Sequence, residues 1–294
     1  MPLRSLIDLF LLAALWGASF LFMRATAPLF GPIALITLRV CIASLFLLPL
    51  LLMQGGGSAL RQHPFRLLLA GLINTAIPFV LLAYATLSLT AGFAAVLNAT
   101  APMWGALLGY LLWQEPLARS RLLGLLVGFS GVALLVWDKV SFKPGGSGLA
   151  VVAGLAATFC YGLASHLVKR QLAGVRPLAV ACGSQLGAAL CLLPLALWQW
   201  PAVHASTAQW GQVVMLGVGC TGIAYILYFR LLSQVGVARA LAVTYLIPLF
   251  GILWGYLLLH ETVTLRMLLG GLVILLGVAL ATGVLPRARP ASPR

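Results

Sequence analysis

Uninterrupted apolar runs recur along this chain and limit its fold more than any other feature. Several of them reach the roughly 20 residues that a helix needs to cross the hydrocarbon core of a bilayer. Charged residues make up 7% of the sequence, whereas soluble domains carry about 25%. The sequence lacks the alternation of apolar and polar residues that marks an outer-membrane β-barrel. It therefore predicts an all-α polytopic membrane protein.

Apolar windows predict ten transmembrane helices. The connections between them are short and leave no room for a soluble domain. The expected helices are Leu6–Met23, Ile33–Met53, Phe65–Leu87, Ala91–Trp113, Leu122–Trp137, Gly148–Val168, Leu178–Trp198, Trp210–Phe229, Val237–Leu259 and Met267–Leu285.

Basic residues are unequally divided between the two sides that these helices define. The amino terminus, the even-numbered connections and the carboxyl tail hold thirteen of the 18 Lys and Arg residues, which leaves five for the other side. The positive-inside rule then places both termini in the cytoplasm. The formal charge of +14 does not predict nucleic-acid binding, because the bases are scattered between apolar runs and no recognition motif accompanies them.

Two stretches of the chain repeat each other at an offset of about 145 residues. Ala94–Leu134 and Ala240–Leu280 share 18 identities in 41 positions. Proline and glutamate are much rarer than leucine in this chain, so their matches carry more weight. The matched residues include Pro102 with Pro248, Gly105 with Gly251, and Glu115 with Glu261.

The repeat divides the predicted helices into two halves, 1–138 and 148–285, followed by a short basic cytoplasmic tail at 286–294. Each half holds five helices, an odd number, so the second half must cross the membrane in the opposite sense. Inverted repeats of this kind form transport sites near the bilayer midplane. The sequence thus predicts an alternating-access transporter, although duplication could also leave symmetry in a scaffold that transports nothing.

Short motifs in a fixed order connect the chain to a known family. They are "LWGASF" at Leu15–Phe20, "LR" at Leu38–Arg39, proline-containing fourth and ninth helices that end in Glu115 and Glu261, and glycine-rich fifth and tenth helices. Over its whole length the chain resembles the drug/metabolite transporter superfamily, in its ten-helix EamA-type branch. Within that branch it is most similar to bacterial YddG-type exporters of aromatic and other neutral amino acids. The resemblance implies export of such metabolites through the inner (plasma) membrane of a bacterium.

Polar and aromatic residues inside the predicted helices are candidates for the cargo site. Asn98 shares one helix face with Pro102 and Gly105, which predicts a face bordering a polar cavity; tight helix packing is the alternative. Buried indole and phenol rings could stack on an apolar or aromatic cargo, or could only pack between helices. The resemblance implies a cavity lined by the first, third, fourth, sixth, eighth and ninth helices, which favours Trp16, Trp104, Tyr161, Tyr225 and Tyr245 as the aromatic candidates.

Arg39 is placed six residues inside the second predicted helix. A charge at the centre of a membrane helix costs about 2.5–3.5 kcal/mol on insertion scales. The side chain is therefore expected either to snorkel to the interface or to attract a carboxylate of the cargo.

The repeated prolines, glycines and glutamates receive structural roles. Pro102 and Pro248 each remove a backbone hydrogen bond, so bends are expected there, with Gly105 and Gly251 at the same gates. Glu115 and Glu261 follow the ends of their helices and are expected to fix the gate loops at the interface. Arg119 and Arg121 are candidate partners of Glu115, and Arg266 is the candidate partner of Glu261.

The sequence favours transport over catalysis. It shows no ATP-binding loop, no carboxylate in the middle of a predicted helix, and four histidines in separate regions. We therefore predict no catalytic residue, no metal and no cofactor, with the lipid bilayer and a small-molecule substrate as partners. Facilitated diffusion or exchange is the simpler mechanism. A drug, nucleoside or sugar derivative stays open as an alternative cargo.

Overall fold

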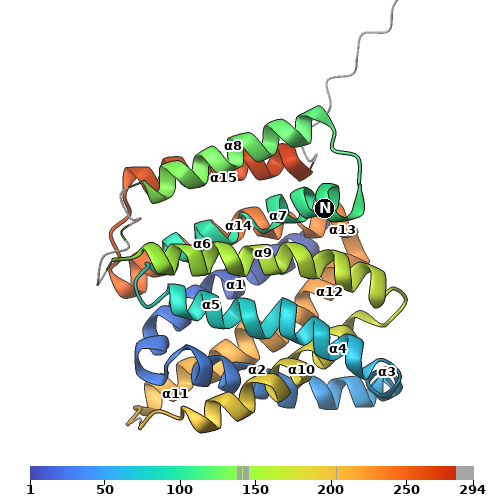
Figure 1. Ribbon diagram of the computed structural model, residues 1–294. Helices are drawn as coiled ribbons and strands as arrows, with labels where there is room; N and C mark the ends of the chain where they lie inside the picture. The colour runs from blue at the N-terminus through green and yellow to red at the C-terminus, as the bar shows by residue number, and fades with distance from the viewer. Residues whose placement is uncertain (138–140, 142–145, 203, 283–294) are drawn as a thin grey trace, which may run out of the picture.

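The structure is a computed structural model that describes residues 1–137, 141, 146–202 and 204–282. Its regular elements are all helices within these ranges, which confirms the predicted all-α class (Figure 1). The tail predicted at 286–294 and the end of the tenth predicted helix lie outside the described residues.

The first half of the chain forms helices close to the five predicted spans. A π-helical segment, η1, interrupts the third span, and a short break separates two helices in the fourth. The elements are α1 (Leu3–Phe30), α2 (Pro32–Met53), α3 (Gly57–Gln62), α4 (Pro64–Gly71), η1 (Leu72–Ala76), α5 (Ile77–Ala85), α6 (Ala91–Asn98), α7 (Ala101–Trp113) and α8 (Arg119–Val136).

The second half repeats this plan. A second π-helical segment, η2, lies in the eighth predicted span, and the ninth span is again made of two helices. The elements are α9 (Gly148–Gln171), α10 (Pro177–Trp198), α11 (Thr207–Val214), η2 (Met215–Ile223), α12 (Ala224–Val235), α13 (Val237–Ala240), α14 (Val243–Leu259) and α15 (Leu265–Thr282).

Length and hydropathy suit these helices to a bilayer. Within the described ranges, nine helical stretches of at least 18 residues are apolar enough to cross a membrane, and α14 is a shorter apolar helix of 17 residues. Helices are favoured in lipid because each satisfies its own backbone hydrogen bonds where water cannot. The ten predicted helices are thus present.

Helices α8 and α15 lie side by side at one edge of the bundle (Figure 1). Glycines bring the two backbones together. A methyl group added at Gly131 would lie 2.7 Å from the backbone nitrogen of Ile274, and one added at Gly124 would collide with the backbone of Ala281. Residue numbers rise along one helix as they fall along the other, so the pair is antiparallel. Small residues permit this close approach.

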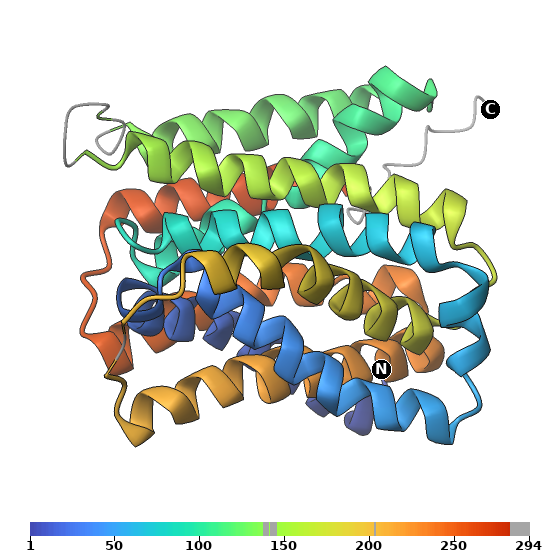
Figure 2. The same cartoon turned by 60° about the horizontal axis from the view of Figure 1, so that its bottom comes forward.

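Helices α2 and α10, the second helix of each half, also pack side by side (Figure 2). The guanidinium of Arg176, just before α10, donates to the carbonyl of Gln54, just after α2, at 2.8 Å. The start of one helix therefore meets the end of the other. In two equivalent helix pairs the halves run in opposite directions, which is the arrangement that an inverted repeat requires.

Helix α1 extends beyond the predicted Leu6–Met23 at both ends. The apolar window stopped before Arg24, because a free charge would not be expected inside a span. In the structure this guanidinium donates to the carbonyls of Thr86 and Leu87 at 2.7 Å each, just past the end of α5. These bonds compensate the charge, so the helix continues through it.

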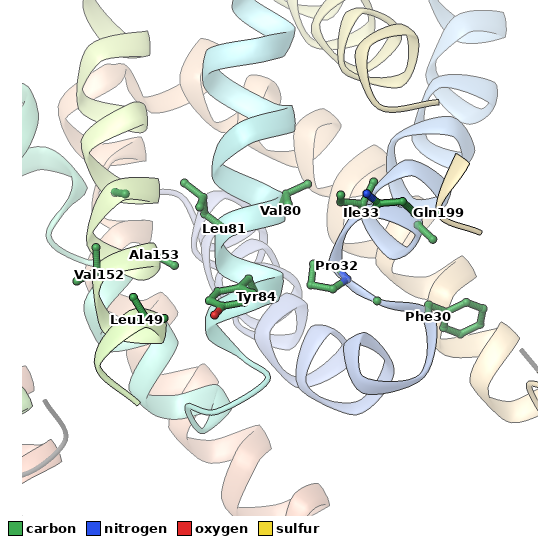
Figure 3. A pocket seen from close by; sticks show the side chains of 13 residues that line it. Phe30, Pro32, Ile33, Val80, Leu81, Tyr84, Leu149, Val152, Ala153 and Gln199 are labelled. Carbon is green, nitrogen blue, oxygen red and sulfur yellow. The ribbon is translucent and has the colours of Figure 1, made fainter. Parts of the chain in front are cut away.

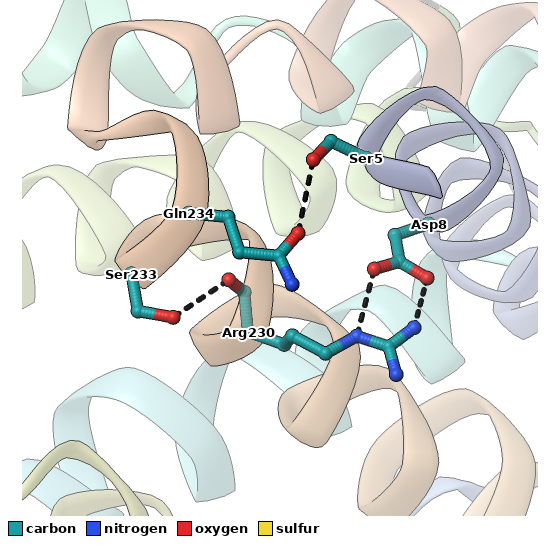
Figure 4. Close-up of polar contacts among 5 residues, drawn as sticks. All are labelled: Ser5, Asp8, Arg230, Ser233 and Gln234. Carbon is teal, nitrogen blue, oxygen red and sulfur yellow. Dashed lines mark hydrogen bonds and ion pairs between the residues drawn. The ribbon is translucent and has the colours of Figure 1, made fainter. Parts of the chain in front are cut away.

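A polar link joins the first part of α1 to the end of α12 (Figure 4). Asp8 is 2% exposed and accepts a hydrogen bond of 2.7 Å from Nε of Arg230, whose Nη2 pairs with the other carboxylate oxygen. The Ser5 hydroxyl donates to Oε1 of Gln234 at 2.9 Å. Because the Asp8 side chain is buried, loss of Arg230 would leave its hydrogen-bonding oxygens without this partner inside the protein.

Candidate functional site

A cavity of about 310 Å³ lies between helices of the two halves. The first half contributes residues of α1, α2, η1, α5 and α6, and the second contributes residues of α9, η2, α12 and α14. Five of the seven predicted cargo residues line it: Trp16, Arg39, Asn98, Tyr161 and Tyr225.

Arg39 provides a buried positive charge at this cavity. It is 4% exposed, so it points into the protein and does not snorkel to an interface. Its Nε donates to the Thr221 hydroxyl at 2.9 Å. Its guanidinium carbon lies 3.8 Å from the centroid of the Phe79 ring, a cation–π contact that partly offsets the desolvation of the charge.

The π-helical geometry of η2 positions Thr221. The threonine hydroxyl donates to the carbonyl of Leu216, five residues earlier, at 2.9 Å. Its oxygen is thereby turned to accept the hydrogen bond from Arg39. Single π-helical turns are frequent at functional sites because they shift a side chain out of the regular helical register.

Aromatic rings form much of the remaining wall. Trp16 and Tyr228 pack with their centroids 5.4 Å apart in a tilted arrangement. Phe79 and Tyr161 meet edge to face, with centroids 6.5 Å apart. Such surfaces bind an apolar or aromatic body through its faces and edges while leaving hydroxyl groups available for hydrogen bonds.

Asn98 is the last residue of α6 and lines the same cavity. Its buried Oδ1 has no hydrogen-bond partner among the described residues. The helix stops here because Pro102, at the start of α7, has no N–H to donate to a preceding turn. The break thus exposes a polar side chain to the cavity. In the second half, Pro248 lies inside the continuous helix α14.

Trp104 and Tyr245 lie outside the lining of this cavity. Trp104 packs edge to face against Phe129 and Phe159, at centroid distances of 5.1 and 5.6 Å. The Tyr245 hydroxyl is 2.9 Å from that of Thr282 on α15. In this structure both side chains therefore join helices.

Eleven lining residues were not among the predicted cargo residues, and they include Asn74, Phe79, Thr221 and Tyr228. Asn74 could have been found, since an amide in the middle of an apolar run is unusual. Phe79, Thr221 and Tyr228 resemble many other residues of the chain. Their place depends on helix packing and on the π-helical turns, which apolar periodicity does not reveal.

Glu115 and Glu261 both lie outside the cavity lining, but in different surroundings. Glu261 accepts hydrogen bonds from the backbone N–H of Ala91 at 2.8 Å and of Gly92 at 3.4 Å, at the start of α6. Glu115 lies 3.7 Å from Nδ1 of His166, and its side chain is 40% exposed.

The matched glycines differ in the same way. A methyl group added at Gly251 would collide with the Cβ of Ala95 on α6. One added at Gly105 would lie 3.7 Å from the Ser165 hydroxyl oxygen on α9, an ordinary contact distance. The described residues thus place α14 tightly against α6.

A second hollow of about 570 Å³ lies between the α1–α2 connection, α5 and α9 (Figure 3). Tyr84 and Gln199 are the polar side chains among its described lining residues. Leu149 and Val152 are among the exposed apolar residues at its rim. An apolar surface of this kind suits lipid chains, whereas the cavity around Arg39 offers polar side chains.

The profile of the EamA-like transporter family matches residues 4–137 and again residues 148–283. The chain belongs to the EamA-like transporter family. Each match lies within one of the two predicted halves, 1–138 and 148–285. Membership places the chain among integral membrane transporters of small molecules, and not among enzymes.

The curated relatives include uncharacterized transporters and one probable amino-acid exporter. The chain is 28% identical over 271 residues to the uncharacterized transporter YdfC of Bacillus subtilis, covering 91% of this chain and 87% of the relative. It is 23% identical to an uncharacterized transporter of Archaeoglobus fulgidus, covering 94% and 98%. A probable terminal-alkyne amino-acid exporter of Streptantibioticus cattleyicolor is 27% identical, with coverage of 94% and 93%.

The fold also matches a solved structure. A crystal structure superposes with a TM-score of 0.70 at 22% identity and covers 97% of this chain and 99% of that protein. The likeness supports the ten-helix architecture.

Proposed function

We propose that this chain exports small, neutral, partly apolar metabolites, amino acids including aromatic ones, by alternating access at the cavity that holds Arg39 and Asn98. The observation that carries the proposal is the chemistry of that cavity. It combines a buried guanidinium, an amide oxygen without a partner among the described residues, and a wall of aromatic rings. Small-molecule binding sites generally combine an apolar wall with a few polar groups in this way.

Two further points support an amino-acid cargo. The sequence resembles YddG-type exporters, and one relative is named as a probable amino-acid exporter. A phosphorylated sugar would require several basic groups in the cavity. Arg39 is the basic residue among its described lining.

The proposed mechanism does not use an acidic side chain in the cavity to couple transport to protons or sodium ions. Three of the four acidic residues are described, and none of the three lines it. Facilitated diffusion or exchange down a gradient therefore accounts for movement through the protein. The two halves, 1–138 and 148–285, would move relative to each other.

The test is reconstitution of the purified chain in liposomes with labelled phenylalanine, tryptophan, leucine and alanine, with and without a pH gradient. Saturable flux of aromatic and apolar amino acids, unchanged by the gradient, is expected. Flux of a nucleoside or a drug with no flux of amino acids would contradict the proposed cargo. No saturable flux of any of these would favour a scaffold.

A pair of variants assigns flux to the cavity. Asn98→Ala removes a lining amide and should change the apparent KM or the order of preference among the four amino acids. Tyr245→Phe removes a hydroxyl that bonds to Thr282 outside the cavity and should leave both unchanged. An unaltered Asn98→Ala carrier would remove this residue from the site.

We also propose that both termini lie in the cytoplasm of a bacterial cell, with the chain in its inner membrane. Glu115 is then cytoplasmic and Glu261 external. A cysteine placed at either position, in a chain whose five cysteines are replaced, should react with a charged maleimide from one side only. Labelling of both positions from the same side would refute the inverted orientation.

A further inference from the structure

We propose that Arg39 binds a carboxylate of the cargo, and that the substrate class of this cavity is therefore small monocarboxylates with an apolar body, for which an amino group is not required. The inference rests on the proposed transport function and extends its cargo from neutral amino acids to anionic monocarboxylates.

The guanidinium of Arg39 has spare hydrogen-bonding capacity. It carries five N–H donors in a planar fork. Among the described residues, one oxygen accepts from it, that of Thr221 at 2.9 Å, and Nη1 has only the sulfur of Met23 at 3.9 Å. Nε is thus fixed by Thr221 while the outer edge of the fork remains available. A carboxylate matches that edge with two parallel hydrogen bonds.

The acidic residues that the structure describes are engaged elsewhere. Asp8 pairs with Arg230, Glu115 lies beside His166, and Glu261 accepts backbone N–H groups at the start of α6. The fourth acid, Asp138, lies outside the described residues. No described acid therefore neutralises Arg39 at the cavity. A buried charge without a counter-charge is costly, and an incoming anion relieves that cost.

Charge balance then ranks the possible cargoes. A monocarboxylate brings one negative charge and makes the pair with Arg39 neutral. A zwitterionic amino acid also brings an ammonium group, so the cavity would keep a net positive charge. Asn98 Oδ1 can accept a hydrogen bond from that ammonium but, as a neutral amide, cannot balance its charge. The amino group is tolerated and is not the basis of recognition.

The size and walls of the cavity set the rest of the cargo. Its volume of about 310 Å³ is at the lower end of ligand pockets, which run from roughly 300 to 1,000 Å³. Phe79 lies against the guanidinium, and Trp16, Tyr228 and Tyr161 supply further aromatic surface in the same cavity. A small molecule with a carboxylate at one end and an apolar or aromatic body at the other fits these features.

The experiment is a binding series on the full-length purified chain in detergent, measured by calorimetry. The probes are phenylalanine, 3-phenylpropionate, which lacks the amine, and phenethylamine and phenylalanine amide, which lack the carboxylate. Phenylalanine and 3-phenylpropionate should bind, with 3-phenylpropionate at least as tight, and the two probes without a carboxylate should not. Equal binding by phenethylamine, loss of binding on removing the amine, or no binding by any probe would overturn the proposal.

Variants tie the result to Arg39. Arg39→Gln should weaken binding of both carboxylates by about tenfold or more, as expected when a charge-assisted pair is lost. Arg66→Gln is the matched control, because Arg66 donates to the carbonyl of Gln171 away from the cavity, and it should bind as the wild type does. Unchanged affinity in a folded Arg39→Gln would refute the assignment.

Two safeguards keep the test decisive. If Arg39→Gln does not give a monodisperse protein, Arg39→Lys keeps the charge but not the planar fork and should retain partial affinity for carboxylates alone. The wild-type probe series also decides the matter without any variant. Binding needs no lipid and no flux, so failure of transport in liposomes and failure of carboxylate recognition are separate results.

Discussion

Helices α7 and α14 carry the same series of proline, two glycines, tyrosine and a following glutamate, yet their surroundings differ. Both pack on the first helix of a half. Gly17 of α1 faces Phe250 and Gly251, and Gly162 of α9 faces Trp104 and Gly105. Among the described residues, the matched residues of α14 make one further contact, with α6. Its Gly251 meets Ala95, and Glu261 accepts the N–H of Ala91.

Equivalent sequence in α7 and α14 does not give equivalent packing in one conformation. The contact with the first helix of a half is shared and can be read as fixed framework. The contact between α14 and α6 is one-sided, and Gly251 and Glu261 contribute to it. In a carrier that works as proposed, such a contact distinguishes one state from the other.

The largest effect is expected from the glycine of the one-sided contact. Gly251→Ala would force a methyl group against Ala95, and overpacking of this kind costs about 1–3 kcal/mol of the free energy of unfolding. Gly105→Ala is the matched substitution, with an ordinary 3.7 Å contact to Ser165, and should change stability by about 0.5 kcal/mol or less. Thermal unfolding in detergent measures both. Equal losses would mean that the two glycines share one environment.

A smaller effect is expected from the matched glutamates. Glu261→Ala leaves the N–H groups of Ala91 and Gly92 without their acceptor, and loss of a helix cap costs about 0.5–2 kcal/mol. Glu115→Ala removes an exposed contact with His166, which is worth about 0–1 kcal/mol.

Hydrogen exchange provides the direct readout for this pair. The amides of Ala91 and Gly92 should exchange faster in Glu261→Ala and at the wild-type rate in Glu115→Ala. Unchanged exchange in Glu261→Ala would show that the carboxylate does not hold the start of α6.

The smallest effect separates two tryptophans of the first half. Trp16→Phe alters a ring on the cavity wall and should change the apparent KM for phenylalanine by about two- to tenfold, the range of an aromatic contact. Trp104→Phe alters a ring packed on Phe129 and Phe159, and phenylalanine already stands at the matching position, Phe250. The apparent KM of Trp104→Phe for phenylalanine should equal that of the wild type. A reversed order would place Trp104 in the cargo path.

Much of the fold could be predicted because apolar length alone selects helices in lipid. The helix ends were harder to predict. Arg24 ended the first predicted span, whereas the carbonyls of Thr86 and Leu87 compensate its charge and allow α1 to continue. Such partners are remote in sequence, so hydropathy cannot anticipate them.

The candidate site was predictable where a residue was unusual for its surroundings. Arg39 and Asn98 stand out as polar groups within apolar runs, and both line the cavity. Thr221 does not stand out, because its role comes from the π-helical turn that aims its hydroxyl at Arg39. Trp104 was as conspicuous as Trp16. The rotation of each helix about its own axis determines whether its tryptophan lies on the cavity wall or packs between helices.

The glycine-lined pair α8 and α15 contributes none of the described residues around the cavity. Its outward leucines, such as Leu126 and Leu272, are more than half exposed on the side away from the cargo. Substitutions in this pair are therefore constrained by contact with lipid and by the close approach of the two backbones. They are not constrained by the proposed cargo. Libraries of variants intended to change the cargo preference can leave both helices constant and randomise the others.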